Sequence, residues 1–151
     1  MEFFTPLQSA APEIIVAAPP TVYQIRPLTD KHLKEVLYLN QRCFKKGENY
    51  TRYTFSFLLS EPRTLSYRIA SPTENMVAFI FVMIGEDGTG HITTVGVAPE
   101  HRRRGLAQKL LVHVEEALIK RGIKTIFLEV RVDNLPAQML YRNFGYSIVQ
   151  R

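Results

Sequence analysis

Three arginines followed by a glycine form the segment whose composition points most directly to chemistry. The run Arg102–Gly105 stands between an apolar segment that ends at Val97 and a helical pattern that begins at Leu106. A glycine lets the backbone turn with several N–H groups aimed at one point, and the positive end of a helix dipole attracts an anion. The loop therefore predicts a phosphate site, although a solvated helix start has the same composition. Because both Gly-Lys-Ser/Thr and G-x-G-x-x-G are missing from the sequence, the expected ligand is a pyrophosphate compound other than a dinucleotide or a P-loop triphosphate.

Two ionisable side chains further along the chain could move protons. Glu129 lies in an otherwise apolar strand pattern, Thr125–Arg131, where a carboxylate is costly unless it is hydrated or paired. Tyr141 follows twelve residues later in a helical pattern. Each residue also has a structural interpretation. Alternation puts Glu129 on the same strand face as Arg131, where a salt bridge or a solvated face would explain it, and Tyr141 could pack in the core.

The order of these segments resembles the GNAT family of acetyl-CoA-dependent N-acetyltransferases. Residues 91–148 contain, in the family's order, a strand, the Arg-x-x-Gly-x-Ala loop, a helix, a strand with Leu-Glu-Val-Arg, a helix with Asn-x-x-Ala-x-x-Leu-Tyr, and Phe-Gly-Tyr. Such an ordered set is much more specific than any of its parts. Within the family, the pattern is most similar to the ribosomal-protein alanine N-acetyltransferases and their relatives that acetylate protein N-termini.

The resemblance implies a role for each motif. The loop would hold the pyrophosphate of acetyl-CoA, and the strand before it would pair with the pantetheine amides almost as an added strand does. The backbone N–H near Val97 would polarise the thioester carbonyl. Glu129 would be the catalytic base, acting through one water, and Tyr141 the catalytic acid that protonates the CoA sulfur.

The resemblance also assigns cofactor contacts. The predicted cofactor-binding residues are Val95, Gly96, Val97, Arg102, Arg103, Arg104, Gly105, Leu106, Ala107, Gln108 and Asn134. Taken without the resemblance, Val95–Val97 is an ordinary buried strand with a bulge, and Asn134 is a helix cap.

These motifs need a sheet and helices that bring them together, and the hydrophobic periodicity predicts such elements. We expect strands at Val22–Arg26, Leu65–Ala70, Met76–Ile84, His91–Val97 and Thr125–Arg131, and helices from Thr29 or Asp30 to Phe44, from Thr51 to Pro62, from Leu106 to Gly122 and after Asn134. The expected fold is α/β, with a mixed, mostly antiparallel GNAT-like sheet flanked by helices. The resemblance implies that the strands at 91–97 and 125–131 splay apart to admit the cofactor.

Length and composition predict one domain, residues 21–151, after a flexible leader, residues 1–20, that contains four prolines. The single cysteine, Cys43, excludes an internal disulfide and fits a reducing cytoplasm. No signal peptide or membrane span is expected. The net charge of +5 favours anionic ligands, and nucleic acid stays a minor alternative because no long basic tract is present. The four histidines show no metal-ligand spacing with Cys43, so no metal is expected. His101, beside the loop, is expected at the surface, with a phosphate contact as the alternative.

Two segments differ from the family. The last strand expected here begins near Tyr146, whereas related enzymes continue into another strand beyond the position of Arg151. We expect either a truncated chain or a substitute strand. The β-prone segment Glu13–Ala17 is a candidate for that strand, within one molecule or by exchange in a homodimer. The segment Phe44–Tyr53 lacks the Pro-Trp of many ribosomal-protein acetyltransferases, so the acceptor is predicted less narrowly than the cofactor.

The sequence as a whole predicts an N-acetyltransferase that moves the acetyl group of acetyl-CoA directly to a primary amine. The expected acceptor is the N-terminus of a protein or peptide, such as a ribosomal protein. Two alternatives stay open: a GNAT enzyme that acetylates a small amine, and a CoA-binding or nucleic-acid-binding module without turnover. The presence of both Glu129 and Tyr141 favours an enzyme over a binding module.

Overall fold

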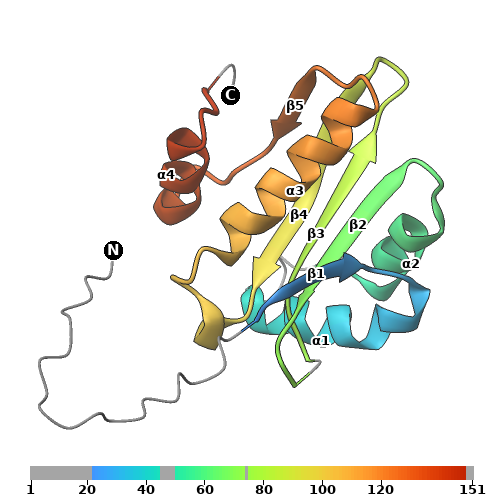
Figure 1. Cartoon of the computed structure of the whole chain (residues 1–151), viewed down its shortest axis with the longest axis vertical. Coiled ribbons are helices and arrows are strands. Elements are labelled where there is room, and N and C mark those ends of the chain that lie inside the picture. Colours follow the sequence, from blue (N-terminus) through green and yellow to red (C-terminus); the bar gives the residue numbers. More distant parts are fainter. Residues whose placement is uncertain (1–21, 45–49, 74, 149–151) are drawn as a thin grey trace, which may run out of the picture.

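A five-stranded sheet with the order β1-β2-β3-β4-β5 runs through the computed structural model, which describes residues 22–44, 50–73 and 75–148 (Figure 1). The strands are β1 (Gln24–Pro27), β2 (Thr64–Ala70), β3 (Met76–Ile84), β4 (Thr89–Val97) and β5 (Thr125–Leu128). Strands β1 to β4 pair antiparallel, and β4 pairs with β5 in parallel after a helical crossover. The expected mixed, mostly antiparallel sheet is confirmed.

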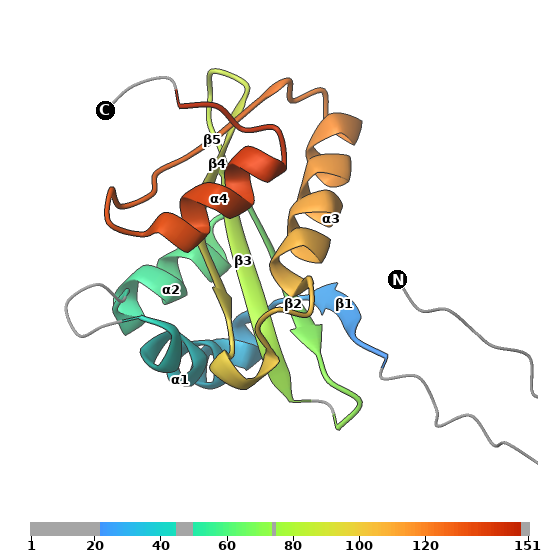
Figure 2. The same cartoon turned by 90° about the vertical axis from the view of Figure 1, so that its left-hand side faces the viewer.

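Helices cover both faces of this sheet. The helical elements are the 3-10 turns η1 (Asp30–His32) and η2 (Pro99–His101) and the α-helices α1 (Leu33–Cys43), α2 (Arg52–Ser60), α3 (Leu106–Lys120) and α4 (Leu135–Asn143). The two views show α3 and α4 on one side of the sheet and α1 and α2 on the other (Figure 1, Figure 2). Thr51 caps α2 as expected, because its side chain accepts the Thr54 N–H at 3.3 Å. Among the described helices, none is long and apolar enough to cross a bilayer.

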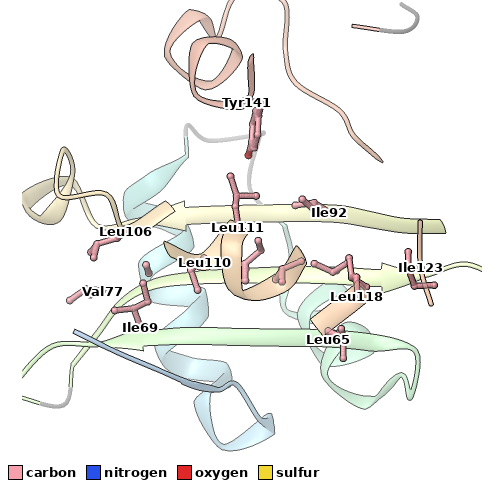
Figure 3. Packing of buried hydrophobic residues seen from close by; sticks show 14 residues of the cluster. Leu65, Ile69, Val77, Ile92, Leu106, Leu110, Leu111, Leu118, Ile123 and Tyr141 are labelled. Carbon is pink, nitrogen blue, oxygen red and sulfur yellow. The ribbon is translucent and has the colours of Figure 1, made fainter. Parts of the chain in front are cut away.

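The alternating side chains of β3 divide the core into two clusters. Phe79 and Phe81 pack with residues of α1 and α2, whereas Ile80 and Val82 pack with residues of α3. Tyr141 joins the α3 cluster from α4 (Figure 3). Both faces of β3 are therefore covered, as its apolar sequence predicts. Each fully buried large apolar side chain contributes about 1.5–3 kcal/mol, so this central strand anchors the layers on both sides.

Strands β4 and β5 diverge halfway along β4. Their pairing joins Thr89–Ile92 to Thr125–Leu128, whereas β4 stays paired with β3 as far as Val97. The expected splay is thus present. The expected strand at Thr125–Arg131 is wrong in its last three residues, because beyond Leu128 the diverging backbone has no neighbouring β4 residue with which to form a ladder.

Other boundaries differ slightly from the prediction, and some expectations cannot be compared. Strand β1 begins two residues late and includes Pro27, which an edge strand tolerates. Residues 146–148 form no strand, so the last strand expected near Tyr146 is not seen in the described part of the chain. The leader, its segment Glu13–Ala17 and residues 45–49 lie outside the described residues.

Candidate active site

The loop between β4 and α3 is built from two residues in left-handed backbone conformation. Arg103 has φ 63° and Gly105 has φ 74°. Gly105 stands at the N-cap of α3, and no side chain caps this helix. The N–H groups of the first helical turn have no partner within their own helix. The loop therefore presents backbone donors and the positive end of α3 to whatever lies in front of it.

Two contacts attach this loop to the rest of the fold. Arg42, in the last turn of α1, forms an ion pair with Glu100 of η2, just before the loop. The hydrogen bond from Arg42 lowers the pKa of the exposed Glu100 carboxyl to about 2. On the other side, the Arg104 guanidinium donates to the Tyr23 hydroxyl, which also lies 2.9 Å from Nδ1 of His101. Helix α1 and the start of β1 thus fix the approach to α3 from two directions.

A cavity of about 790 Å³ lies in front of the loop, between the end of β4 and α4. Ten of the eleven predicted cofactor residues line it: Val95, Gly96, Val97, Arg102, Arg103, Gly105, Leu106, Ala107, Gln108 and Asn134. Arg104 is the exception, since its side chain bonds to Tyr23. The loop, the β4 edge and the start of α4 therefore form one site.

Several lining residues escaped the sequence-based prediction. They are Cys43, Phe44, His101, Arg131, Asp133, Pro136, Ala137 and Leu140. His101 was expected at the surface, but it is half-buried and lines the cavity, because the 3-10 turn η2 directs it there. Cys43 and Phe44 reach the cavity from the end of α1, a contact across the sheet that local sequence does not reveal. The nearness of Pro136 and Ala137 to the predicted Asn134 in the sequence is the one signal that could have indicated the α4 side of the cavity.

The edge of β4 that faces away from β3 borders this cavity. The Ala98 N–H donates to the Val77 carbonyl at 2.8 Å, toward β3. Because backbone groups alternate along an antiparallel pair, Val97 and Val95 direct theirs to the opposite edge. The Val97 carbonyl accepts there from Cys43 Sγ at 3.3 Å and from Arg102 Nε at 3.1 Å. Beyond Ile92 this edge has no β5 residue beside it.

Gly96 allows β4 to lie close to the aromatic core, and we expect Gly96→Ala to lower the free energy of unfolding by about 1–3 kcal/mol. A Cβ at this position would lie 2.8 Å from two ring carbons of Phe79 and 3.2 Å from Cys43 Sγ. Urea denaturation measures the loss. Adding Gly96→Ala to a Phe79→Leu variant should cost less than adding it to the wild type. Equal stability of Gly96→Ala and wild type would show that the strand has room there.

Glu129 follows directly after β5 and is open to solvent. Its side chain is 86% exposed, and its Oε1 lies 3.7 Å from Nε2 of His91 on β4. Arg131, the partner considered from sequence, donates to Asp133 at 3.2 Å. The side-chain neighbour of Glu129 is therefore His91, one strand over.

Tyr141 is buried in α4. It is 9% exposed, and its ring lies 5.8 Å from the ring of Tyr146. Burial raises the pKa of Tyr141 to about 12, so the phenol keeps its proton throughout the neutral range. Figure 3 shows the ring reaching down from α4 toward Leu111, so packing is part of its role.

Glu129 and Tyr141 approach the divergence of β4 and β5 from opposite faces of the sheet. Ile126 and Leu128 pack with the cluster that contains Tyr141, whereas Phe127 stacks on His91, the partner of Glu129. Both candidate residues line a second cavity of about 690 Å³ along β5, and neither lines the cavity in front of the loop. Helix α4 contributes to both cavities, so they lie on either side of it.

Two further residues that line the loop cavity, the predicted Asn134 and the unpredicted Cys43, have defined local roles. The Asn134 side chain accepts the Ala137 N–H at 3.2 Å, so it caps α4 and also lines the loop cavity. Burial raises the pKa of the Cys43 thiol, which keeps it protonated and unsuited to act as a nucleophile. Within the described residues, no group of three or more His, Cys, Asp or Glu side chains could hold a metal ion.

An α/β sheet whose splayed strands meet a glycine loop at a helix N-terminus defines a class of acyltransferase folds. Residues 33–146 match the Acetyltransferase (GNAT) family. The chain therefore belongs to the GNAT family, whose members use acetyl-CoA.

Two curated proteins are similar over parts of the chain. N-alpha-acetyltransferase daf-31 of Caenorhabditis elegans is 36% identical over 102 residues, which cover 64% of this chain and 56% of that protein. The [ribosomal protein bS18]-alanine N-acetyltransferase of Escherichia coli is 36% identical over 72 residues, 48% of each protein. The chain thus spans about half the length of the curated relatives it matches.

Solved structures share the fold over most of the chain. The crystal structure of the ribosomal-protein-S18-alanine N-acetyltransferase from Escherichia coli has a TM-score of 0.78 at 26% identity, covering 85% of this chain and 80% of that one. An aminoglycoside N-acetyltransferase in complex with CoA has a TM-score of 0.76 at 16% identity, covering 91% and 95%. The second likeness bears on the fold alone.

Proposed function

We propose that this protein transfers the acetyl group of acetyl-CoA to the N-terminal amine of a protein or peptide. The observation that carries the proposal is the shared cavity. The uncapped first turn of α3 opens into it, and the β4 edge beyond Ile92 forms its wall. A ligand that combines phosphates with a chain of amides suits such a site, because one part needs clustered N–H donors and the other needs a strand edge.

The residues around the cavity fit the donor. Backbone N–H groups of Gly105 to Gln108 would hold the pyrophosphate, and Arg102 and Arg103 would add positive charge. Gly105 suits this approach, because even an added Cβ would meet only Gln108 Oε1, at 3.8 Å. Val95 and Val97 would pair with the pantetheine amides, and the Val97 N–H would polarise the carbonyl under attack. When bound, acetyl-CoA supplies the activated thioester.

Glu129 would take a proton from the acceptor amine through one water. Its open position suits the end of a peptide chain better than an enclosed small molecule. An N-terminal α-amine has a pKa of about 7.7–8.0, against about 10.4 for lysine, so a carboxylate needs less help to deprotonate it. The names of the relatives agree with this acceptor, since one is an N-alpha-acetyltransferase and the other is an alanine N-acetyltransferase of ribosomal protein bS18.

Tyr141 would return a proton to the sulfur as the C–S bond breaks and the new C–N bond forms. Its burial keeps the phenol neutral, which is the form an acid needs. Starting from the protonated amine, two protons leave through Glu129 as the amide forms, and the Tyr141 oxygen recovers one proton from solvent. One proton is released for each amide formed.

We expect thiol release from acetyl-CoA with peptides that begin with alanine. The matched control is the same peptide with a blocked N-terminus and a free internal lysine, which should give at least about tenfold less release because its amine is more basic. Spermidine and an aminoglycoside test the small-amine alternative. Faster release with either small amine than with every peptide would overturn the acceptor assignment. Binding of acetyl-CoA without release for any amine would identify a binding module.

A further inference from the structure

His91 meets the predicted base in a defined geometry. It is the register partner of Phe127, one strand over. The two rings stack with centroids 4.5 Å apart and an angle of 5° between their planes. Nε2 of the imidazole lies 3.7 Å from Glu129 Oε1. The stack therefore fixes the plane of a histidine whose nitrogen faces the exposed carboxylate.

Glu129 is the acidic neighbour of His91 among the described residues, and the other groups considered around His91 are neutral. Met83, its register partner on β3, is neutral. Tyr50, ahead of α2, donates its hydroxyl to the Thr93 carbonyl at 2.8 Å. Burial raises the pKa of Tyr50, and the negative charge of Glu129 raises it further, so this phenol stays neutral too. His91 is thus the side chain with ring nitrogens that the described structure puts beside Glu129.

An exposed carboxylate on a chain segment beyond its strand has many side-chain conformations to choose from. A base needs one of them, because proton transfer demands hydrogen-bond reach to the amine or its water. The imidazole, with Nε2 3.7 Å from Glu129 Oε1, can restrict the orientation of the carboxylate, and the Phe127 stack keeps the imidazole itself in place.

We propose that His91 is a positioning residue for the acetyl transfer, acting through Glu129. This inference rests on the proposed function and adds a residue to it. His91 holds the carboxylate directed toward the acceptor amine. It does not touch the donor, whose cavity its side chain does not line.

His91→Phe tests this role, because the variant keeps a flat aromatic ring against Phe127 and removes both ring nitrogens. We expect kcat for peptide acetylation to fall about five- to fiftyfold. The Kd for acetyl-CoA measured by calorimetry and the melting temperature should stay near wild type. His91→Gln should restore part of the activity, since its amide again offers an N–H. The matched control is His113→Phe, whose ring contacts Tyr67 at 4.5 Å on the α3 side and should leave kcat unchanged.

A double variant shows whether His91 acts through Glu129. In a Glu129→Gln background, His91→Phe should cause little further loss of kcat. An equal loss in both backgrounds, or an unchanged kcat in His91→Phe, would overturn the inference. A readout without turnover accompanies these rates: the imidazole NMR resonances of His91 should shift in Glu129→Gln, and unmoved resonances would also overturn it. A wild type that acetylates no amine would instead refute the proposed function, and the inference with it.

Discussion

Gly105→Glu is expected to raise the Kd for acetyl-CoA at least about a hundredfold while the protein stays folded. Gly105 stands at the N-cap of α3 with φ 74°. A side chain there is strained by about 1–2 kcal/mol, and a carboxylate would take the place where phosphate oxygens meet the first-turn N–H groups. The lost anion site and the like-charge repulsion together weaken acetyl-CoA binding more than the backbone strain alone would. Calorimetric titration with acetyl-CoA measures the change.

Gly122→Glu is the matched control for this variant. Gly122 follows the other end of α3, has φ 79°, and an added Cβ would meet nothing within 4 Å. The same substitution thus brings the same kind of strain and the same charge, away from the cavity. We expect Gly122→Glu to bind acetyl-CoA like the wild type. A folded Gly105→Glu protein with wild-type affinity would remove the phosphate role of the loop.

Tyr141→Phe is expected to lower turnover by about tenfold to a thousandfold. The variant keeps the ring in the core and removes the hydroxyl, for which no partner exists among the described residues. The free energy of unfolding should therefore change by about 1 kcal/mol or less, and acetyl-CoA affinity should be nearly intact. Steady-state kinetics and urea denaturation of one preparation give both numbers.

Tyr146→Phe should show the opposite pattern. The Tyr146 hydroxyl donates to Glu115 Oε1 at 3.0 Å, so its removal costs a charge-assisted bond, about 1.5–3 kcal/mol, with little effect on turnover.

The pH dependence of stability adds a second check on Tyr141. Its folded pKa, about 12, lies above the ordinary value of about 10. The folded state therefore holds this proton more tightly, and the stability that it contributes is lost as pH rises from about 10 to 12. Wild-type turnover in Tyr141→Phe would reduce this residue to a packing role.

Local signals explain why much of the site could be predicted from the sequence. A glycine that needs a left-handed conformation, an apolar run before it and a helical repeat after it are all read within twenty residues. The almost wholly apolar run of β3 likewise predicted a strand buried on both faces. The order of the motifs indicated that β4 and β5 splay.

Contacts between distant segments could not be predicted in the same way. The end of β5 at Leu128 depends on where β4 turns away, and the sequence around Glu129 continues to alternate as if the strand went on. The partner of Glu129 depends on the register of two strands, which brings His91 beside Phe127 across an intervening helix. Arg104 lies among residues that line the cavity, yet it turns to Tyr23 at the start of the sheet. Each of these outcomes is set by tertiary packing.

The β4 edge beyond Ile92 makes the donor resemble a component of the sheet as well as a substrate. Under the proposed function, backbone N–H groups that a neighbouring strand would satisfy elsewhere are satisfied here by a diffusing metabolite. Binding of the donor then adds directly to the free energy of unfolding. A ligand present at a hundred times its Kd adds about 2.7 kcal/mol to the stability of the native state. The supply of acetyl-CoA would thus set what fraction of the protein is folded, in addition to how fast it works.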